Sequence, residues 1–131
     1  MKTILFICKE NKYRSQIAEA LFNRLTTSHK AFSASGAEPA DKISEDAVKL
    51  LKKAYNIDII GQKPKRLTKS MLEKADRVIV LCNPEDCILI PKKYLVEHWN
   101  IQKMENLEET EKFKALDDLR NKVMALIAEL G

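Results

Sequence analysis

Eight consecutive residues early in the chain carry the groups needed to bind and attack an oxyanion: Cys8-Lys9-Glu10-Asn11-Lys12-Tyr13-Arg14-Ser15. A loop that leads into a helix can point several backbone N–H groups at one spot, where the helix end adds partial positive charge. Arg14 can bind two oxygens of a tetrahedral anion with its planar guanidinium. The same positive field stabilises a thiolate on Cys8, to which Ser15 can donate a hydrogen bond. We predict an anion receptor made of residues 9–14 with a nucleophilic cysteine at its floor.

The alternative is that Cys8 is a buried structural thiol and Arg14 a solvated side chain six positions later. The flanking elements favour the receptor. Residues 3–7 form a continuous apolar run, which is typical of a strand buried on both faces of a parallel sheet. Apolar residues then recur at 3.6-residue spacing from Ile17 to Leu25, which predicts a helix. The receptor segment therefore connects a buried strand to the start of a helix.

The rest of the chain continues this alternation of strands and helices. We predict further strands at 31–34, 77–81 and 94–99, and helices that follow an N-cap at Ser44, span 68–75, and follow a capping box of Asn106 and Glu109. This order predicts one α/β domain over residues 1–131, with three layers and a four-stranded, mostly parallel sheet flanked by helices. Ligands of such sheets bind beyond the carboxyl ends of the strands, and two of those ends carry cysteine, Cys8 and Cys82.

Composition excludes several classes of protein. The 131 residues are 45% hydrophobic and 32% charged with 3 Gly and 4 Pro, which fits one globular domain and excludes collagen-like and disordered chains. No apolar run is long enough for a membrane span, and the net charge of +4 without interleaved basic and aromatic residues argues against nucleic-acid binding. Three cysteines without an export signal predict reduced thiols in the cytoplasm. We expect a monomer with no cofactor and no metal.

Residues beyond the loop extend the pattern into a likeness to a known family. The segments that carry it are Ile4 to Cys8, Asn11, Arg14 to Glu19, Cys82, Cys87 and Glu97 to Trp99. With them the sequence resembles the low-molecular-weight protein-tyrosine phosphatase superfamily, which includes the thioredoxin-coupled arsenate reductases. The resemblance covers about residues 2 to 100. A cysteine after the third predicted strand, a further cysteine shortly after it and the Glu-His-Trp segment are closer to the reductases than to the phosphatases.

The resemblance implies a relay of three thiols. Cys8 would attack arsenate bound in the loop, and Cys82 would attack the Cys8 adduct, releasing arsenite and leaving a Cys8–Cys82 disulfide. Cys87 would then attack Cys82, which moves the disulfide to a Cys82–Cys87 pair for thioredoxin to reduce. Outside such a relay, Cys82 is a small apolar residue on a buried strand and Cys87 an incidental loop thiol.

The chain departs from the family at several positions. Glu10 stands where the loop usually has glycine, and Tyr13 stands where a second cysteine is usual. The Asp-Pro that supplies the general acid in both branches is absent, and Lys103 aligns with that acid. Asp86 and Glu105 are the carboxylates that could take its place.

The resemblance also implies a potassium site behind the loop in some reductases. Asn11, Glu19 and Ser33 match three of its ligands, but Lys65 stands at the fourth. The Lys65 ammonium either replaces the ion or is solvated in the basic loop 63–69, and we expect no bound potassium.

Three functions follow, in this order of preference. The first is reduction of arsenate to arsenite through Cys8, Cys82 and Cys87, with thioredoxin as a partner. The second is hydrolysis of phosphotyrosine through a phosphoenzyme on Cys8, and the third is binding of an oxyanion or phosphopeptide with weak catalysis, which Glu10 and Lys103 would favour. The expected substrates are therefore arsenate, phosphate or phosphotyrosine.

Overall fold

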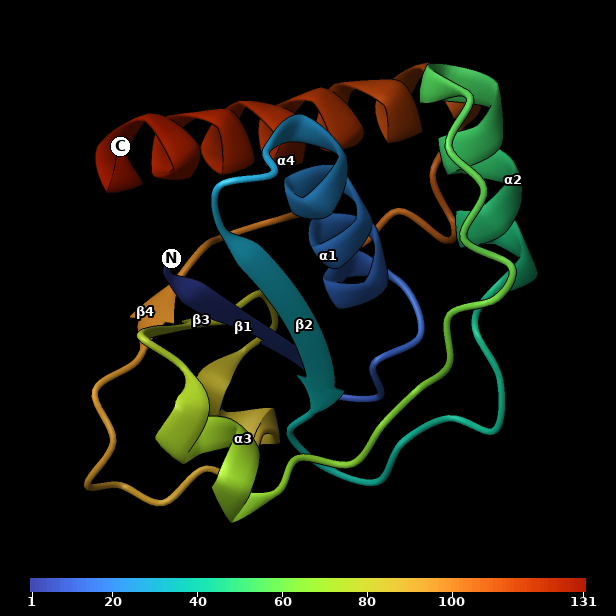
Figure 1. Cartoon of the computed structure of the whole chain (residues 1–131). Coiled ribbons are helices and arrows are strands. Elements are labelled where there is room, and N and C mark those ends of the chain that lie inside the picture. Colours follow the sequence, from blue (N-terminus) through green and yellow to red (C-terminus); the bar gives the residue numbers. More distant parts are fainter.

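Four parallel strands form the central sheet, in the order β2-β1-β3-β4 (Figure 1). They are β1 (Thr3–Cys8), β2 (Lys30–Ser35), β3 (Arg77–Val80) and β4 (Glu97–His98). The computed structural model describes the backbone of residues 1–131 and every side chain except that of Pro84. The apolar run after the N-terminus is β1, a central strand that is buried on both faces, as its composition predicts.

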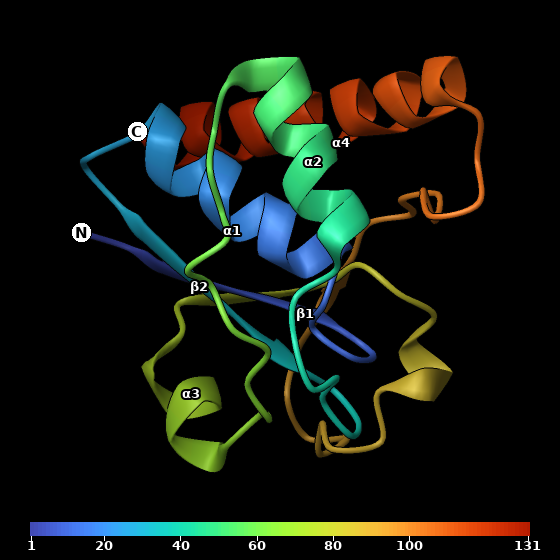
Figure 2. The ribbon, with the colours of Figure 1, turned by 90° about the vertical axis from the view of Figure 1, so that its right-hand side faces the viewer.

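Helices cover both faces of this sheet. The helices α1 (Arg14–Leu25), α2 (Glu45–Tyr55) and α4 (Glu109–Leu130) lie on one side, and the short α3 (Lys69–Lys74) lies on the other (Figures 1 and 2). The alternation of side chains along β1 divides the core accordingly. Ile4 and Phe6 pack with α1, α2 and α4, whereas Leu5 and Ile7 pack with Leu72 of α3. The predicted three-layer α/β fold is confirmed.

Local signals placed two helix starts correctly. Ser44 is the N-cap of α2 and accepts a hydrogen bond from the Ala47 N–H at 3.3 Å, while Thr68 accepts one from the Met71 N–H at the start of α3. The helix α4 has 22 residues, yet no helix in the described part of the chain is apolar enough over a sufficient length to span a bilayer.

Two predictions about the last third of the chain were wrong. The predicted capping box of Asn106 and Glu109 does not form, because Leu107 N–H donates to the Met104 carbonyl in a turn and Glu108 becomes the N-cap without a side-chain bond. The strand predicted at 94–99 is limited to β4, since the preceding segment turns away and leaves Leu95 96% exposed.

Because all strands are parallel, their carboxyl ends meet at one edge of the sheet. Cys8 ends β1, Gly36 follows β2, and Cys82 follows β3 by two residues. The same edge holds the start of α1, so the predicted receptor and the second cysteine lie together.

Candidate active site

The loop between β1 and α1 is shaped by Asn11, which has the left-handed φ of 56°. Its carbonyl and its side-chain oxygen both accept hydrogen bonds from Gln16 Nε2, at 2.9 and 3.2 Å. The side-chain oxygen also accepts from the backbone N–H of Lys65. Asparagine tolerates this backbone conformation better than most residues, and here its side chain fastens the loop to α1 and to the segment before α3.

A chain of hydrogen bonds fixes how Ser15 meets Cys8. Asn11 Nδ2 donates to Ser15 Oγ at 2.8 Å and to Ser33 Oγ at 3.0 Å, and Ser33 in turn donates to Glu19 Oε1 at 2.7 Å. Ser15 Oγ therefore already accepts a bond, and its own hydrogen is free for Cys8 Sγ, 2.8 Å away. Ser15 is fully buried. The structure therefore places the Ser15 hydroxyl where it can donate to Cys8 Sγ.

Arg14 begins α1 and is anchored across the sheet edge. Its Nη1 donates to the carbonyls of Leu81, at 2.9 Å, and Ile101, at 2.7 Å. These carbonyls come just after β3 and β4, so the guanidinium ties the loop to both strand ends. No other hydrogen bond of the guanidinium to a described residue is seen, which leaves its other N–H groups for an anion.

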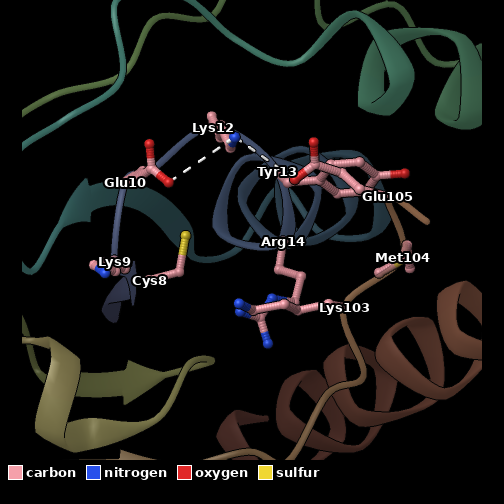
Figure 3. Close-up of a pocket in the computed structure, with 9 residues that line it drawn as sticks. All are labelled: Cys8, Lys9, Glu10, Lys12, Tyr13, Arg14, Lys103, Met104 and Glu105. Carbon is pink, nitrogen blue, oxygen red and sulfur yellow. Dashed lines mark ion pairs between the residues drawn. The ribbon is translucent and has the colours of Figure 1, made fainter.

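A pocket of about 100 Å³ opens beside Cys8 (Figure 3). It is lined by Cys8, Lys9, Glu10, Lys12, Tyr13, Arg14, Lys103, Met104 and Glu105. Of the predicted oxyanion-binding residues, only Asn11 is absent from this lining, because it is buried beneath the loop. Four cationic side chains against two carboxylates favour an anionic ligand.

The two carboxylates of the pocket share one lysine. Lys12 Nζ lies 3.9 Å from Glu10 Oε1 and 3.6 Å from Glu105 Oε1, and Figure 3 shows it between them. The repulsion that Glu10 would exert on an anion is therefore partly offset by Lys12. In this view Glu10 and Lys12 lie above the Cys8 thiol, whereas the side chains of Arg14 and Lys103 lie below it.

The structure brings the other two cysteines to the same edge. Cys82 Sγ and Cys87 Sγ are 2.9 Å apart, both residues are about 4% exposed, and neither forms a disulfide. Together with Cys8 they belong to one buried apolar cluster between the sheet and α3. All three predicted thiols are thus neighbours in space, although they come from distant parts of the chain.

Electrostatics distinguish the two members of this pair. The hydrogen bond donated by Cys87 lowers the pKa of Cys82, and the charge of Arg14 adds to this effect against burial and Asp86. The same bond, together with burial, raises the pKa of Cys87. Cys82 is therefore the more readily ionised member of the pair, and Cys87 donates the hydrogen bond to it.

Gly36 is a part of this site that sequence reasoning missed, since no motif or periodicity connects it with the cysteines. Its N–H donates to the Cys8 carbonyl at 2.8 Å, and its carbonyl accepts from the Leu89 N–H at 2.8 Å. A Cβ at this position would lie 2.5 Å from both Cβ and Sγ of Cys87. Only a glycine lets Cys87 approach the chain after β2 this closely.

A second missed group anchors the loop from its other side. Tyr13 donates through its hydroxyl to Asp46 Oδ2 at 2.5 Å, and Lys112 of α4 donates to the other oxygen of that carboxylate at 2.8 Å. Burial and the bond to Asp46 raise the pKa of Tyr13. Burial opposes ionisation of Asp46, but the bonds from Lys112 and Tyr13 outweigh it and lower its pKa. The neutral Tyr13 side chain therefore holds the loop against Asp46 and does not serve as an acid.

Lys65 contacts the acidic end of the hydrogen-bond chain behind the loop. Its Nζ lies 3.9 Å from Glu19 Oε1, while its side chain remains 41% exposed. Lys65 is thus paired with one residue of the expected potassium site, Glu19, and is also partly solvated, so features of both alternatives are present. Among the described side chains, no group of three or more His, Cys, Asp or Glu could hold a metal ion.

The two carboxylates suggested as replacements for the missing general acid are now separated. Glu105 lines the pocket with Cys8, as does Lys103. Asp86 instead acts on the Cys82–Cys87 pair, where its charge raises the pKa of both thiols. His98 is exposed, and Trp99 packs on Phe6 with ring centroids 5.6 Å apart, so the Glu-His-Trp segment has a structural part.

Comparison with known proteins agrees with this geometry. Residues 3–123 match the family described as low molecular weight phosphotyrosine protein phosphatase. An arsenate reductase of Oceanobacillus iheyensis is 30% identical over 127 residues, which cover 93% of this chain and 89% of that protein.

Two solved structures extend the comparison. A low molecular weight protein tyrosine phosphatase from T. tengcongensis superposes with a TM-score of 0.78 at 25% identity, over 98% of this chain and 99% of that one. A thioredoxin-dependent arsenate reductase of Corynebacterium glutamicum superposes with a TM-score of 0.77 at 25% identity, over 98% of this chain and 61% of that one.

Proposed function

We propose that this chain, which belongs to the low molecular weight phosphotyrosine protein phosphatase family, reduces arsenate to arsenite with electrons from its own thiols. The observation that carries the proposal is the Cys82–Cys87 contact of 2.9 Å in the same buried cluster as Cys8. Hydrolysis of a phosphate ester needs no thiol besides the nucleophile. Two further thiols packed beside the loop serve a reaction that consumes electrons.

The first step takes place in the pocket. Arg14, the loop amides and the lysines hold arsenate, and the Cys8 thiolate attacks arsenic(V) while one oxygen leaves as water after protonation. The product is a Cys8–S–As(V) adduct, in which arsenic has not yet been reduced. Ser15 supports this step through its 2.8 Å contact with Cys8 Sγ, which stabilises the attacking thiolate.

The second and third steps move two electrons. The Cys82 thiolate attacks Cys8 Sγ, so that the S–As bond breaks, its electron pair stays on arsenic as arsenite, and a Cys8–Cys82 disulfide forms. Cys87, after passing its proton to solvent, attacks Cys82 and releases the Cys8 thiolate. Thioredoxin, or another protein dithiol, then reduces the Cys82–Cys87 disulfide. These reaction steps need no cofactor. They suit the reducing cytoplasm that the free cysteines suggest.

Peptide mapping after arsenate treatment tests the relay. Wild-type protein should yield a Cys82–Cys87 disulfide, Cys87→Ser should trap Cys8–Cys82, and Cys8→Ser should yield neither above background. Phosphate, which has the same shape but is not reduced, serves as the control anion. Formation of the disulfide at equal rates in Cys8→Ser would refute the proposal.

Hydrolysis of aryl phosphates is the second candidate function. The observation that favours it is the loop itself, since Cys8, Ser15 and Arg14 are arranged for nucleophilic attack on any tetrahedral oxyanion. Turnover of 4-nitrophenyl phosphate by the Cys82→Ser, Cys87→Ser double variant, together with the absence of an arsenate-dependent disulfide in wild type, would assign the protein to that activity.

A further inference from the structure

The proposed first step needs a proton for the oxygen that leaves. Cys8 attacks from the loop, and in an in-line displacement the departing oxygen lies opposite the nucleophile. The pocket wall that does not belong to the loop is formed by Lys103, Met104 and Glu105. A proton donor for the departing oxygen is therefore expected on this wall.

Few groups of the pocket can fill that role. The Tyr13 hydroxyl is bonded to Asp46, and burial together with that bond raises its pKa. A lysine ammonium, such as that of Lys103, is ordinarily a weaker acid than a carboxylic acid by about 6 pK units. Glu10 belongs to the loop that carries the nucleophile, on the same side as Cys8. The carboxyl group of Glu105 is the one left on the facing wall.

The surroundings of Glu105 suit a donor that must be recharged after each cycle. Its side chain is 47% exposed, so it can exchange protons with solvent, and Lys12 Nζ holds it at 3.6 Å. Its charge contributes to the raised pKa of Tyr13, and Figure 3 shows the two side chains next to each other at the pocket.

We infer that Glu105 is the catalytic acid of this site, replacing the acid that family members carry two positions earlier in the alignment, where this chain has Lys103. This inference rests on the proposed function. The step is Cys8–S⁻ + H₂AsO₄⁻ + Glu105–COOH → Cys8–S–AsO₃H⁻ + H₂O + Glu105–COO⁻. The S–As bond forms, one As–O bond breaks with its electron pair on oxygen, and the Glu105 proton completes the water.

The test compares Glu105→Gln with Glu108→Gln in a single-turnover assay of arsenate-driven disulfide formation. Glu108 is an exposed glutamate at the start of α4, outside the pocket lining, and is the matched control. Glu105→Gln should lower the rate at saturating arsenate by about 10²–10⁴-fold, the usual contribution of a general acid. The arsenate concentration giving half the maximal rate, and the iodoacetamide reactivity of Cys8, should change less than about threefold, because binding and the nucleophile are intact.

Several outcomes would overturn the inference. One is a Glu105→Gln rate within about threefold of wild type. A second is a loss of Cys8 reactivity that parallels the loss of rate, which marks a structural role. A third is a drop of about 10²-fold or more in Glu10→Gln while Glu105→Gln stays near wild type, which would assign the acid to the loop.

Failure of the proposed function is distinguishable. If wild type forms no arsenate-dependent disulfide, the acid is tested with phenyl and 4-nitrophenyl phosphate. Glu105→Gln should then slow phenyl phosphate by at least about tenfold more than nitrophenyl phosphate, because only the poorer leaving group needs the proton. Equal slowing of the two, or no turnover of either by wild type, overturns the inference.

Discussion

Replacing Gly36 with alanine tests how closely Cys87 of the Cys82–Cys87 pair is packed against the segment that follows β2. The added Cβ would lie 2.5 Å from Cβ and Sγ of Cys87 and 2.9 Å from its Cα. Since carbon atoms pack best at about 3.5–4.0 Å, Cys87 must move by about 1 Å. That movement strains the Cys82–Cys87 contact of 2.9 Å and the 2.8 Å bond from the Leu89 N–H to the Gly36 carbonyl.

The expected cost combines overpacking and one weakened hydrogen bond. Overpacking costs about 1–3 kcal/mol and a backbone hydrogen bond about 1 kcal/mol, so the free energy of unfolding should fall by about 2–4 kcal/mol. Urea denaturation measures this change in the free energy of unfolding. Cys87, now about 4% exposed, should also be alkylated by iodoacetamide faster in the variant than in wild type.

Gly61→Ala is the matched control. No atom lies within 4 Å of the Cβ that it would add, so the same substitution should be neutral or stabilising by up to about 1 kcal/mol. A second background, Cys87→Gly, removes the two closest clashing atoms and should reduce the cost of Gly36→Ala. A cost equal to that of Gly61→Ala within about 0.5 kcal/mol, or an unchanged cost in the Cys87→Gly background, would refute the packing argument.

Two further substitutions test the supports of the loop. Ser15→Ala removes the 2.8 Å contact with Cys8 Sγ. Labelling of Cys8 by iodoacetamide near neutral pH should slow by about tenfold, which is the equivalent of one charge-assisted hydrogen bond. Labelling at the wild-type rate would contradict the role of this hydroxyl. Asp46→Asn breaks the ion pair with Lys112 and should cost at most about 1 kcal/mol at pH 7, because the carboxylate is 39% exposed and screened. Folding lowers the Asp46 pKa below its ordinary value of 3.8. This stability is therefore present above that pH and is lost as the pH falls through the folded pKa, so the urea midpoints of wild type and variant should converge in acid. A difference that does not shrink as the pH is lowered would contradict this reasoning.

Local patterns determined most of the fold and the receptor. The apolar run of β1 and the helical spacing of α1 defined the strand–loop–helix unit, so the position of Cys8 at a strand end and of Ser15 in the first turn of α1 followed directly. The capping residue Ser44 placed the start of α2 for the same reason, because the N-cap bond joins residues three apart. Sequence also selected Cys82 and Cys87, through resemblance.

Edges and turns were less predictable from local pattern. The segment before β4 is apolar enough for a strand, but an edge strand pairs on one side only, and the chain turns before it can extend. Asn106 has the spacing of a capping box with Glu109. It lies instead inside the turn that the Leu107 N–H closes on the Met104 carbonyl. Where two local structures compete, the surrounding packing decides between them.

Only the tertiary structure decided the contacts that make the site. Arg14 is anchored to the Ile101 carbonyl across 87 positions, and Tyr13 to Asp46 across 33. The approach of Cys87 to Gly36, and the position of Glu105 on the pocket wall facing the loop, likewise join distant segments. The sequence by itself determined which residues could do the chemistry. Their mutual placement required the parallel sheet, because its shared carboxyl edge brings together segments that no periodicity or motif connects.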